Sequence, residues 1–234
     1  MRVREQEGMT EMPLAGTGML LTSMDIDAAD EEEFNRWYDR EHLQERVAID
    51  GFLEARRYIA DAGSRKYLCL YSTTTIEVLD SPAYRNRLAN PTEWSKKTMA
   101  RFKNMIRAVA RITISRGQGR GAALGIIRLR SAPGEQDRLR TALRKALDPL
   151  DLHGVISMHL IESDSALSGP TTEIRSAASV GSGDWFALID ATDVNAASTA
   201  IATRFADGVP FKSAVISTGT YRLMWDLAKS DIPA

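Results

Sequence analysis

The stretch FNRWYDREHLQER, residues 34–46, decides how the rest of this chain is interpreted. It places Trp37 and Tyr38 close to Glu41 and to His42, one of only three histidines in the sequence. Each residue of an α-helix advances by about 100°, so a helix here carries Trp37, Tyr38 and Glu41 on one face. His42 lies at the edge of that face. No other stretch of the sequence combines aromatic and titratable side chains so closely.

The apolar pattern of this helix is interrupted in its second part. Leu43 and Val47 are apolar, but in a regular helix they fall on the side opposite Trp37 and Glu41. We therefore expect the helix to bend or stop near His42.

Two functions are open for the aromatic face of this helix. A carboxylate held among aromatic rings has its charged form disfavoured and its pKa raised. Glu41 in such a setting, next to His42, could transfer a proton near neutral pH. In the structural alternative the two aromatic rings fill the core, Glu41 pairs with an arginine, and His42 caps the helix or bonds a carbonyl group.

The composition argues against several classes of function. The 234 residues include 30 basic and 31 acidic side chains, which gives a net charge of −1 and a pI near 6.3. This balance gives no general attraction to nucleic acid or to an anionic membrane. Hydrophobic residues make up 44% of the chain, as in ordinary globular domains, and the length suits one large domain or two small ones.

The single cysteine, Cys69, excludes an internal disulfide and suggests a reducing compartment. It lies in a strand-like run, so we expect a buried structural thiol. No apolar run approaches the length of a membrane span, and residues 1–16 contain no continuous apolar segment of a signal peptide. We therefore expect a frayed N-terminal tail and a cytoplasmic protein.

The first half of the chain reads as strand, helix, strand, strand, helix, strand, which is the ferredoxin-like plan. Asp27 or Asp30 can cap the first helix, and Gly51 can end it. The expected elements are strands at 19–26, 52–60, 66–74 and 108–115, the helix at 34–46, a short helix from 82 that ends at 90–92, and a helix at 93–106.

The second half follows a flexible linker, residues 117–121, whose glycines lack the lysine and hydroxyl residue of a phosphate-binding loop. Its element order is the same, so we expect an internal repeat that is visible in element order and hardly at all in residue identity. Residues 163–182 are rich in Ser, Gly, Thr and Ala and are expected to form a loop. The other expected elements are strands at 122–130, 155–162, 184–191 and 213–227 and helices at 135–147 and 194–205.

Both predicted sheets carry apolar residues beyond the face that the helices cover, for example Leu20, Leu68, Leu70, Ile127 and Leu129. Such a sheet needs a second layer, and the simplest one is the sheet of the other half. We therefore predict an α+β fold in which tandem ferredoxin-like βαββαβ repeats turn their antiparallel sheets toward each other in a barrel, with the helices outside. The expected parts are an N-terminal tail at 1–17, a first repeat with the candidate pocket at 18–116, the linker at 117–121, and a second, degenerate repeat at 122–234.

Five motifs of the first half carry a family resemblance. They are FNxWYDxEHLxER at 34–46, GFxxARRY at 51–58, KYLxLY at 66–71, LxSPAY at 79–84 and NPTEW at 90–94. Together they resemble the dimeric α/β-barrel superfamily, and most nearly its EthD-like members. The resemblance covers about residues 18–115, whereas the second half is similar only in element order. This chain departs from the usual case by fusing two repeats.

The resemblance implies a barrel that handles a small molecule, without deciding the reaction. The superfamily includes polyketide cyclases, cofactor-free monooxygenases, muconolactone-type isomerases, aldoxime dehydratases and haem-binding chlorite dismutases. Its members often bind the ligand between the helices and the sheet of one repeat. The helix predicted at 135–147 has no counterpart of Trp37, Glu41 or His42, so we expect one working pocket per chain. If this chain binds its ligand in the same place, the resemblance implies a pocket lined by Trp37, Tyr38, Glu41, His42, Arg57 and Trp94.

Our leading hypothesis is a cofactor-independent acid–base enzyme that acts on a small aromatic, polyketide-like or cyclic organic metabolite. His42, helped by Glu41, would move a proton in a lyase, dehydratase, isomerase or cyclase step, with a cofactor-free monooxygenase as a related option. Arg57 or Tyr58 would stabilise a developing oxyanion. Arg56 is an alternative to Arg57, because strand alternation lets only one of them face the helices. The substrate would contact Trp37, Tyr38, Tyr58 and Trp94.

Two further hypotheses are a non-catalytic small-molecule-binding or stress-response barrel, and a haem protein with His159 as axial ligand. The alternation of His159 with Met158 and Leu160 favours a satisfied core histidine instead. His42, His153 and His159 are scattered over both halves, so we expect no metal site and no cofactor. The expected partner is a small molecule, with neither nucleic acid nor membrane, and the chain could be a monomer or a homodimer.

Overall fold

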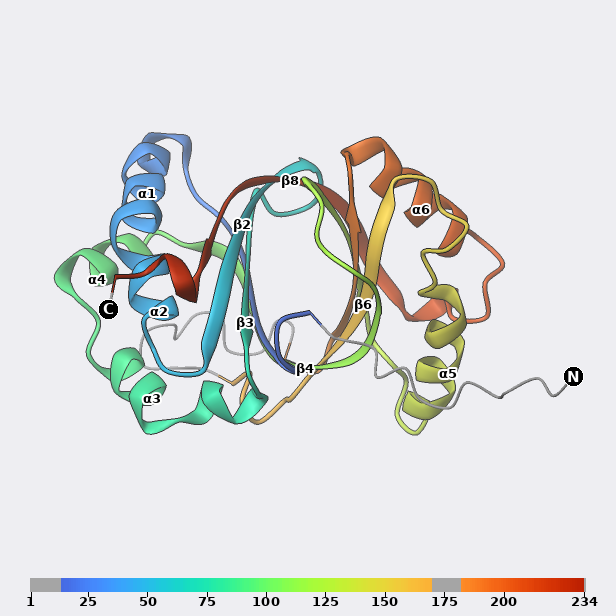
Figure 1. Ribbon diagram of the computed structural model, residues 1–234, viewed down its shortest axis with the longest axis horizontal. Coiled ribbons are helices and arrows are strands. Elements are labelled where there is room, and N and C mark those ends of the chain that lie inside the picture. The colour runs from blue at the N-terminus through green and yellow to red at the C-terminus, as the bar shows by residue number, and fades with distance from the viewer. Residues whose placement is uncertain (1–13, 170–181, 234) are drawn as a thin grey trace, which may run out of the picture.

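Eight antiparallel strands close into a barrel, with a layer of helices on each of two opposite sides (Figure 1). The computed structural model describes residues 14–169 and 182–233. Around the barrel the strands follow the order β1-β3-β2-β8-β5-β7-β6-β4. The α+β fold class predicted from the sequence is therefore confirmed.

Both halves of the chain have the element order strand, helix, strand, strand, helix, strand. The elements of the first half are β1 (Gly18–Asp25), α1 (Glu31–Trp37), η2 (Tyr38–His42), α2 (Leu43–Val47), β2 (Phe52–Ala62), β3 (Tyr67–Thr73), α3 (Pro82–Ala89), α4 (Glu93–Met99) and β4 (Lys103–Gly117). Those of the second half are β5 (Ala123–Leu129), α5 (Gln136–Ala146), β6 (Val155–Ser163), β7 (Trp185–Ala191), α6 (Val194–Arg204) and β8 (Val215–Ala228). Short 3-10 turns lie at Ala28–Asp30, Ile76–Asp80, Lys212–Ala214 and Lys229–Asp231.

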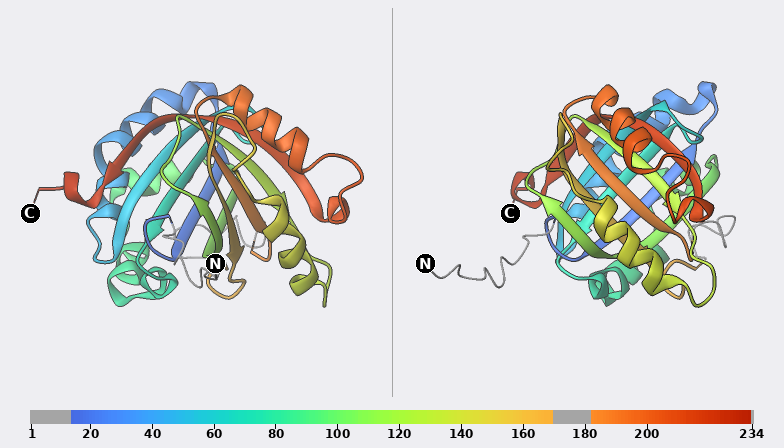
Figure 2. Two further views of the ribbon diagram at one scale, coloured as in Figure 1. Left: turned by 45° about the vertical axis from the view of Figure 1, so that its right-hand side comes forward. Right: turned by 90° about the vertical axis from the view of Figure 1, so that its right-hand side faces the viewer.

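Two long strands join the halves. β4 pairs with β1 along its first part and with β6 from Ala110 to Gly117. β8 pairs with β5 along its first part and with β2 from Thr220 to Ala228. Figure 2 (left) shows β8 crossing from one helical layer to the other. Because each long strand continues onto the sheet of the other half, the described strands leave no open edge.

Side chains along each strand alternate between the barrel interior and a helical layer, as the pleat requires. Leu68 and Leu70 lie inside the barrel, as the sequence predicts. The same prediction is wrong for Leu20, Ile127 and Leu129, which pack under the helices. The conclusion drawn from these residues still holds, because their neighbours in each strand fill the interior with apolar side chains.

The long helix of the first half, α1–η2–α2, is continuous but changes its winding. The Leu43 N–H donates to the Tyr38 carbonyl oxygen five residues back, which makes Tyr38–His42 a π-turn. The wider turn rotates the following segment, so that Leu43 and Val47 are completely buried. The sequence predicts that the helix bends or stops near His42, whereas in the structure it continues through one turn of π-helix. Gly51, at a φ of 86°, lies in the turn that ends this helix and leads into β2.

The boundary between α4 and β4 differs from the prediction. The helix predicted at 93–106 ends at Met99, and the strand begins at Lys103. Asn104 adopts a φ of 52°, in the left-handed region, as the strand begins. Met105 and Ile106 belong to this strand, and a run this short fits the end of a helix as well as the start of a strand.

The start of the long helix also differs from the prediction. Neither Asp27 nor Asp30 caps a described helix with its side chain. Their carboxylates instead form ion pairs with Lys103 and Arg101, at 2.6 and 3.1 Å respectively. Both aspartates thus connect the long helix to the α4–β4 region.

Parts of two predicted segments cannot be compared with the structure. Residues 1–13 of the predicted tail and 170–181 of the predicted loop lie outside the described residues. The other elements of the second half lie where the sequence predicts them. Over the described ranges, no helix combines the length and apolarity that a membrane crossing requires.

Candidate functional site

A small cavity separates the long helix of the first half from the sheet beneath it. Tyr38, His42 and Arg46 line it from the helix, and Thr22 and Arg107 are among the residues that line it from the sheet. Its volume is about 30 Å³, enough for about one water molecule. The sequence left open whether this layer holds an open pocket or is filled by core aromatics, and the structure shows it almost filled.

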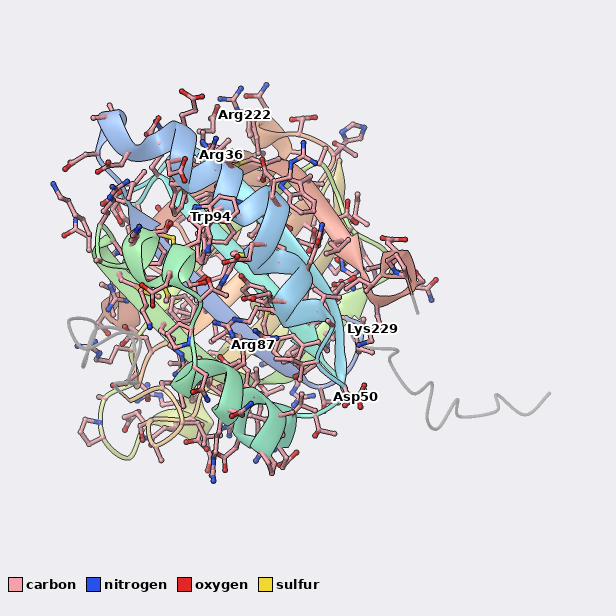
Figure 3. The ribbon with its side chains drawn as sticks, turned by 90° about the vertical axis from the view of Figure 1, so that its left-hand side faces the viewer. Arg36, Asp50, Arg87, Trp94, Arg222 and Lys229 are labelled. Atoms are coloured by element: carbon pink, nitrogen blue, oxygen red, sulfur yellow. The ribbon has the colours of Figure 1, made fainter. Side chains whose placement is uncertain are left out.

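Helices α3 and α4 and the segment after them cover this cavity from the outside. Leu88, Met99 and Phe102 form the cover and are half-buried. Figure 3 looks onto the seam between this cover and the long helix, where Arg87 lies. Arg87 Nη1 donates to Glu45 Oε1 across the seam at 3.1 Å. The cover is therefore held to the long helix partly by an ion pair that solvent can reach.

His42 is buried on this cavity by the π-turn that contains it. Its ring stacks on Trp37 at a centroid distance of 4.1 Å and meets the edge of Tyr38 at 5.1 Å. Burial lowers the pKa of His42 well below its usual value, and the nearby Arg46 and Arg57 lower it further. His42 is therefore neutral at physiological pH. Its Nδ1 is buried and has no hydrogen-bond partner in the part of the chain that the structure describes.

Two buried arginines, Arg46 and Arg107, bring positive charge to the cavity. Arg107 Nη1 donates to the Leu167 carbonyl oxygen at 2.8 Å, and its Nη2 donates to the Tyr84 hydroxyl at 3.4 Å. Both partners are neutral, and no described carboxylate forms an ion pair with Arg107. A buried guanidinium bonded only to neutral groups favours an anionic ligand beside it.

Sequence reasoning missed Arg107 and Arg46. The predicted helix at 93–106 left Arg107 unassigned to any face of a strand. With the correct boundary, an arginine between the apolar Met105 and Val109 on the helix-facing side of a strand is a visible signal. Arg46 lies four residues after His42 and eight after Tyr38, the spacing of one helical face, and this spacing is the signal that could have indicated it.

Three hydroxyl groups complete the polar lining of the cavity. Thr22 Oγ1 and Tyr71 Oη are buried and, like His42 Nδ1, have no hydrogen-bond partner among the described residues. The Tyr38 hydroxyl contacts Met24 Sδ at 3.9 Å. Burial raises the pKa of Tyr38 and of Tyr71, so both phenols stay protonated and can donate hydrogen bonds.

Arg57, and not Arg56, faces the helical layer. Arg57 Nη1 donates to Asp39 Oδ1 at 3.0 Å, and its Nη2 donates to Asn35 Oδ1 at 2.5 Å. Its guanidinium lies 4.3 Å from the centre of the Tyr38 ring. Asp39 also accepts from Trp225 Nε1 of β8 at 2.9 Å. Arg57 therefore ties the long helix to the barrel, and it does not line the cavity.

Glu41 is half-buried and does not face the cavity. Its Oε1 accepts hydrogen bonds from Trp37 Nε1 at 3.1 Å, from Thr92 Oγ1 at 2.6 Å and from Ser95 Oγ at 3.2 Å. No described arginine pairs with it, contrary to the structural alternative considered from the sequence. Glu41 thus bridges the long helix to the start of α4, where Thr92 caps the helix by accepting the Ser95 N–H.

The predicted substrate-binding residues are only partly brought together. Tyr38 lines the cavity, and Trp37 supports the His42 ring from outside it. Trp94 is half-buried near the outer surface, with the Arg36 guanidinium 5.8 Å from its ring centre (Figure 3). Tyr58 points into the barrel, on the opposite face of the sheet, and so is not available to a ligand in the helical layer.

The barrel interior holds a separate polar cluster around His159. Ser157 Oγ donates to the Gly119 carbonyl oxygen at 2.8 Å, so it accepts from His159 Nε2–H at 2.9 Å. His159 Nδ1 then accepts from the Ser115 hydroxyl at 2.8 Å. Burial lowers the pKa of His159 to about 3, with a further contribution from Arg120. His159 is therefore a neutral core histidine with both ring nitrogens satisfied, which argues against an axial haem ligand.

Two larger hollows lie on the second half beside α5, with volumes of about 710 and 700 Å³. The sequence predicts a working pocket only in the first half. A haem would need a histidine, cysteine, methionine or tyrosine as axial ligand, and the residues that line these hollows include none. No cluster of three or more metal-binding side chains occurs within residues 14–169 and 182–233. We place the candidate site at the cavity of the first half, because three buried polar atoms on residues that line it, Thr22 Oγ1, His42 Nδ1 and Tyr71 Oη, have no hydrogen-bond partner in the described residues.

No family model and no curated protein sequence matches this chain. Solved structures do resemble it. An anthrone oxidase-like protein superposes with a TM-score of 0.64 at 11% identity, over 93% of this chain and 96% of that protein. A proposed monooxygenase from Lactobacillus acidophilus NCFM gives a TM-score of 0.54 at 11% identity, over 91% and 97% of the two chains. A mutant chlorite dismutase from Candidatus Nitrospira defluvii gives 0.51 at 8% identity, over 89% and 91%.

These similarities extend over almost the whole of each chain, at identities too low to carry a function across. They bear on the architecture, and they agree with the strand order and the two helical layers described above. This chain therefore has the ferredoxin-like α+β barrel fold that these structures share.

Proposed function

We propose that this protein binds a small aromatic or polyketide-like molecule with an acidic C–H or O–H group, and that His42 removes that proton. The observation that carries the proposal is His42 Nδ1, buried without a partner in the described residues on a cavity that Arg107 also lines. Buried polar atoms without partners are rare in folded proteins and destabilising. Such an atom beside an arginine that has no counter-ion in the described residues favours a polar ligand at this cavity.

The proton transfer follows from the charges around the cavity. The neutral His42 Nδ1 accepts the proton, and the electron pair stays on the substrate as an enolate, phenolate or carbanion. The Arg107 guanidinium stabilises this negative charge and so lowers the pKa of the bound substrate. The same negative charge also offsets the effect of the arginines that lower the pKa of His42. The pKa of His42 therefore rises when the substrate anion forms, and the protonated imidazolium is stabilised.

The fate of the anion decides the reaction type. Return of the proton to another atom gives an isomerisation or cyclisation, and loss of a leaving group gives a lyase reaction. The resemblance of residues 18–115 to EthD-like proteins supports this range of reactions. Reaction of the carbanion with O₂ is the oxygenase variant of the proposal, and an anthrone oxidase-like protein is among the proteins that share this fold.

A ligand of this kind needs more room than the cavity has. Binding sites for organic molecules have volumes of about 300–1,000 Å³, against about 30 Å³ here. The proposal therefore includes an outward movement of Met99 and Phe102, the half-buried cover. Glu41 and Arg57 act in it as positioning residues, because they hold the helix that carries His42.

The second candidate function is binding without chemistry, and the nearly filled cavity favours it. In that case the same polar atoms hold an anionic ligand and no proton is lost. The domain division stays as predicted from the sequence: a first repeat at 18–116 that carries the site, and a second repeat at 122–234 that completes the barrel.

Deuterium exchange into the ligand separates the two candidates. Anthrone, a hydroxynaphthoate and a muconolactone-type lactone are incubated with the protein in D₂O, and exchange at the acidic C–H is followed by mass spectrometry. Wild type is expected to catalyse exchange on at least one compound class. His42→Gln is expected to lower the rate by about two to four orders of magnitude. Phe102→Ala is expected to raise it by opening the cavity.

His153→Gln is the matched control, because this exposed histidine belongs to the second half of the chain, whereas the cavity is lined by residues of the first half. Its exchange rate should equal that of wild type. If His42→Gln retains the wild-type rate, the assignment of the base is wrong. If the compounds raise the Tm of both proteins by binding to the folded state, but neither protein catalyses exchange, the protein is a binder.

A further inference from the structure

A groove runs along helix α5 on the second half, and the proposed activity does not use it. It consists of two adjoining hollows of about 710 and 700 Å³ between α5 and the segment around Pro210, which share Arg138, Ala142, Pro210 and Phe211 as lining residues. We call these two connected hollows the α5 groove. Figure 2 (right) looks onto α5 and α6, the helices that cover this side of the barrel.

The groove exists because α5 carries small side chains where the long helix of the first half carries large ones. In the first half, Trp37 and Tyr38 fill the layer between helix and sheet. The corresponding layer of the second half contains Ala142 and Ala146, which are only partly buried, beside the apolar Leu139. The small side chains of Ala142 and Ala146 therefore leave room beside α5, although Trp185, Phe205 and Phe211 fill the core beneath it.

One end of the α5 groove carries excess positive charge. Asp184 is completely buried and accepts from Arg128 Nε at 2.5 Å and from Arg130 Nε at 2.6 Å. A single carboxylate thus pairs with two guanidinium groups, which leaves an excess of one positive charge in this cluster. The Arg130 side chain is 59% exposed, so it can also bind a ligand from solution. The Glu135–Arg138 pair at the rim, at 3.3 Å, is neutral as a pair and leaves this excess unchanged.

We propose that the α5 groove binds an amphipathic monoanion, a molecule with a carboxylate head and an apolar body. The head pairs with Arg130 at the basic end, and the body lies along Leu139, Ala142 and Phe211. The volume of each hollow, about 710 and 700 Å³, lies in the range of sites for organic ligands, about 300–1,000 Å³. A charged guanidinium gives a carboxylate charge-assisted hydrogen bonds, while burial of the body removes apolar surface from water.

The test uses decanoate as the probe and decanol as its uncharged counterpart. Binding to the full chain is measured by displacement of 1-anilinonaphthalene-8-sulfonate fluorescence. Decanoate should bind more tightly than decanol, and Arg130→Gln should weaken decanoate by about tenfold while leaving decanol unchanged. Ala142→Phe should abolish binding of both by filling the groove. The controls are Arg111→Gln, which removes a similarly exposed, ion-paired arginine from the first half, and Thr199→Phe on the exposed face of α6.

A decanoate analogue with a photoreactive diazirine then locates the site. Labelled peptides should come from α5 or from residues 209–216. Labelling confined to the first half would overturn the proposal. Equal affinity for decanoate and decanol, or equal loss in Arg130→Gln and Arg111→Gln, would show that the positive end does not recognise the head. Retained binding in a folded Ala142→Phe variant would show that the groove is not the site.

Discussion

The indole ring of Trp37 and the imidazole ring of His42 stack at a centroid distance of 4.1 Å, with an angle of 30° between their planes. In a regular α-helix, residues five apart in sequence point about 140° away from each other, so this pair would not share a face. The π-turn at Tyr38–His42 places an extra residue between them and brings the rings together. The stack buries His42 and keeps it neutral, which is the state that a proton acceptor needs.

Stability should fall in acid because two histidines are buried in their neutral form. Burial lowers the pKa of His159 to about 3 and that of His42 well below its usual value. In the unfolded chain both groups titrate near 6.5. Below pH 6.5 the unfolded chain therefore binds protons that the folded chain does not, and the free energy of unfolding decreases as the pH falls.

Urea unfolding at pH 7.5, 6.5 and 5.0 measures this effect. Each histidine should contribute a loss on the order of 1–2 kcal/mol between pH 6.5 and 5, and none at higher pH. His159→Gln removes one of these contributions, so its stability should depend less steeply on pH than that of wild type. Parallel pH dependence of the two proteins would show that His159 already takes up a proton in the folded state.

Glu41 should matter for stability through the donors that it satisfies. Glu41→Ala leaves Thr92 Oγ1 without its bond of 2.6 Å and removes one acceptor each from Trp37 and Ser95. We expect a loss of about 1–3 kcal/mol in the free energy of unfolding. Glu41→Gln keeps an acceptor oxygen and should recover most of it. Equal losses in the two variants, measured by chemical denaturation, would argue against this bridging role.

Arg56 and Asp190 form an ion pair inside the barrel, at 2.9 Å, with both side chains almost completely buried. Asp190→Asn leaves the guanidinium charge without its counter-ion and should cost about 3–5 kcal/mol. The double variant Arg56→Met with Asp190→Asn removes both charges and should be more stable than Asp190→Asn alone. A double-mutant cycle by urea unfolding measures this coupling, and additive effects would contradict it.

Cys69 should be chemically inert in the folded protein. It is buried, and burial raises the pKa of its thiol to about 12. Because the thiolate is the reactive form, an aromatic disulfide reagent should modify it only after unfolding. The modification rate should therefore rise with urea in parallel with the unfolding transition. Rapid modification in native buffer would show that β3 opens locally.

Much of the candidate site follows from sequence patterns, and the exceptions have specific causes. Helical spacing predicts that Tyr38 and His42 lie near each other, and both line the cavity. Strand alternation leaves open whether Arg56 or Arg57 faces the helices, and the structure shows that Arg57 does. Tyr58 was assigned to the site although alternation with Arg57 already directs it into the barrel. The sequence does not indicate Arg107, because the helix predicted at 93–106 and the strand predicted at 108–115 leave it outside both, whereas β4 begins at Lys103.

The sequence by itself determined the order of the elements and the α+β barrel, because apolar periodicity is set by the geometry of a single helix or strand. Only the tertiary structure decided which face of each strand lies under the helices and which groups the side chains meet. Glu41 bonds Trp37, Thr92 and Ser95 in place of an arginine, and the cavity beside His42 is almost filled while the α5 groove is open. Such contacts join residues far apart in the chain, and the space left between them depends on how all their volumes pack together.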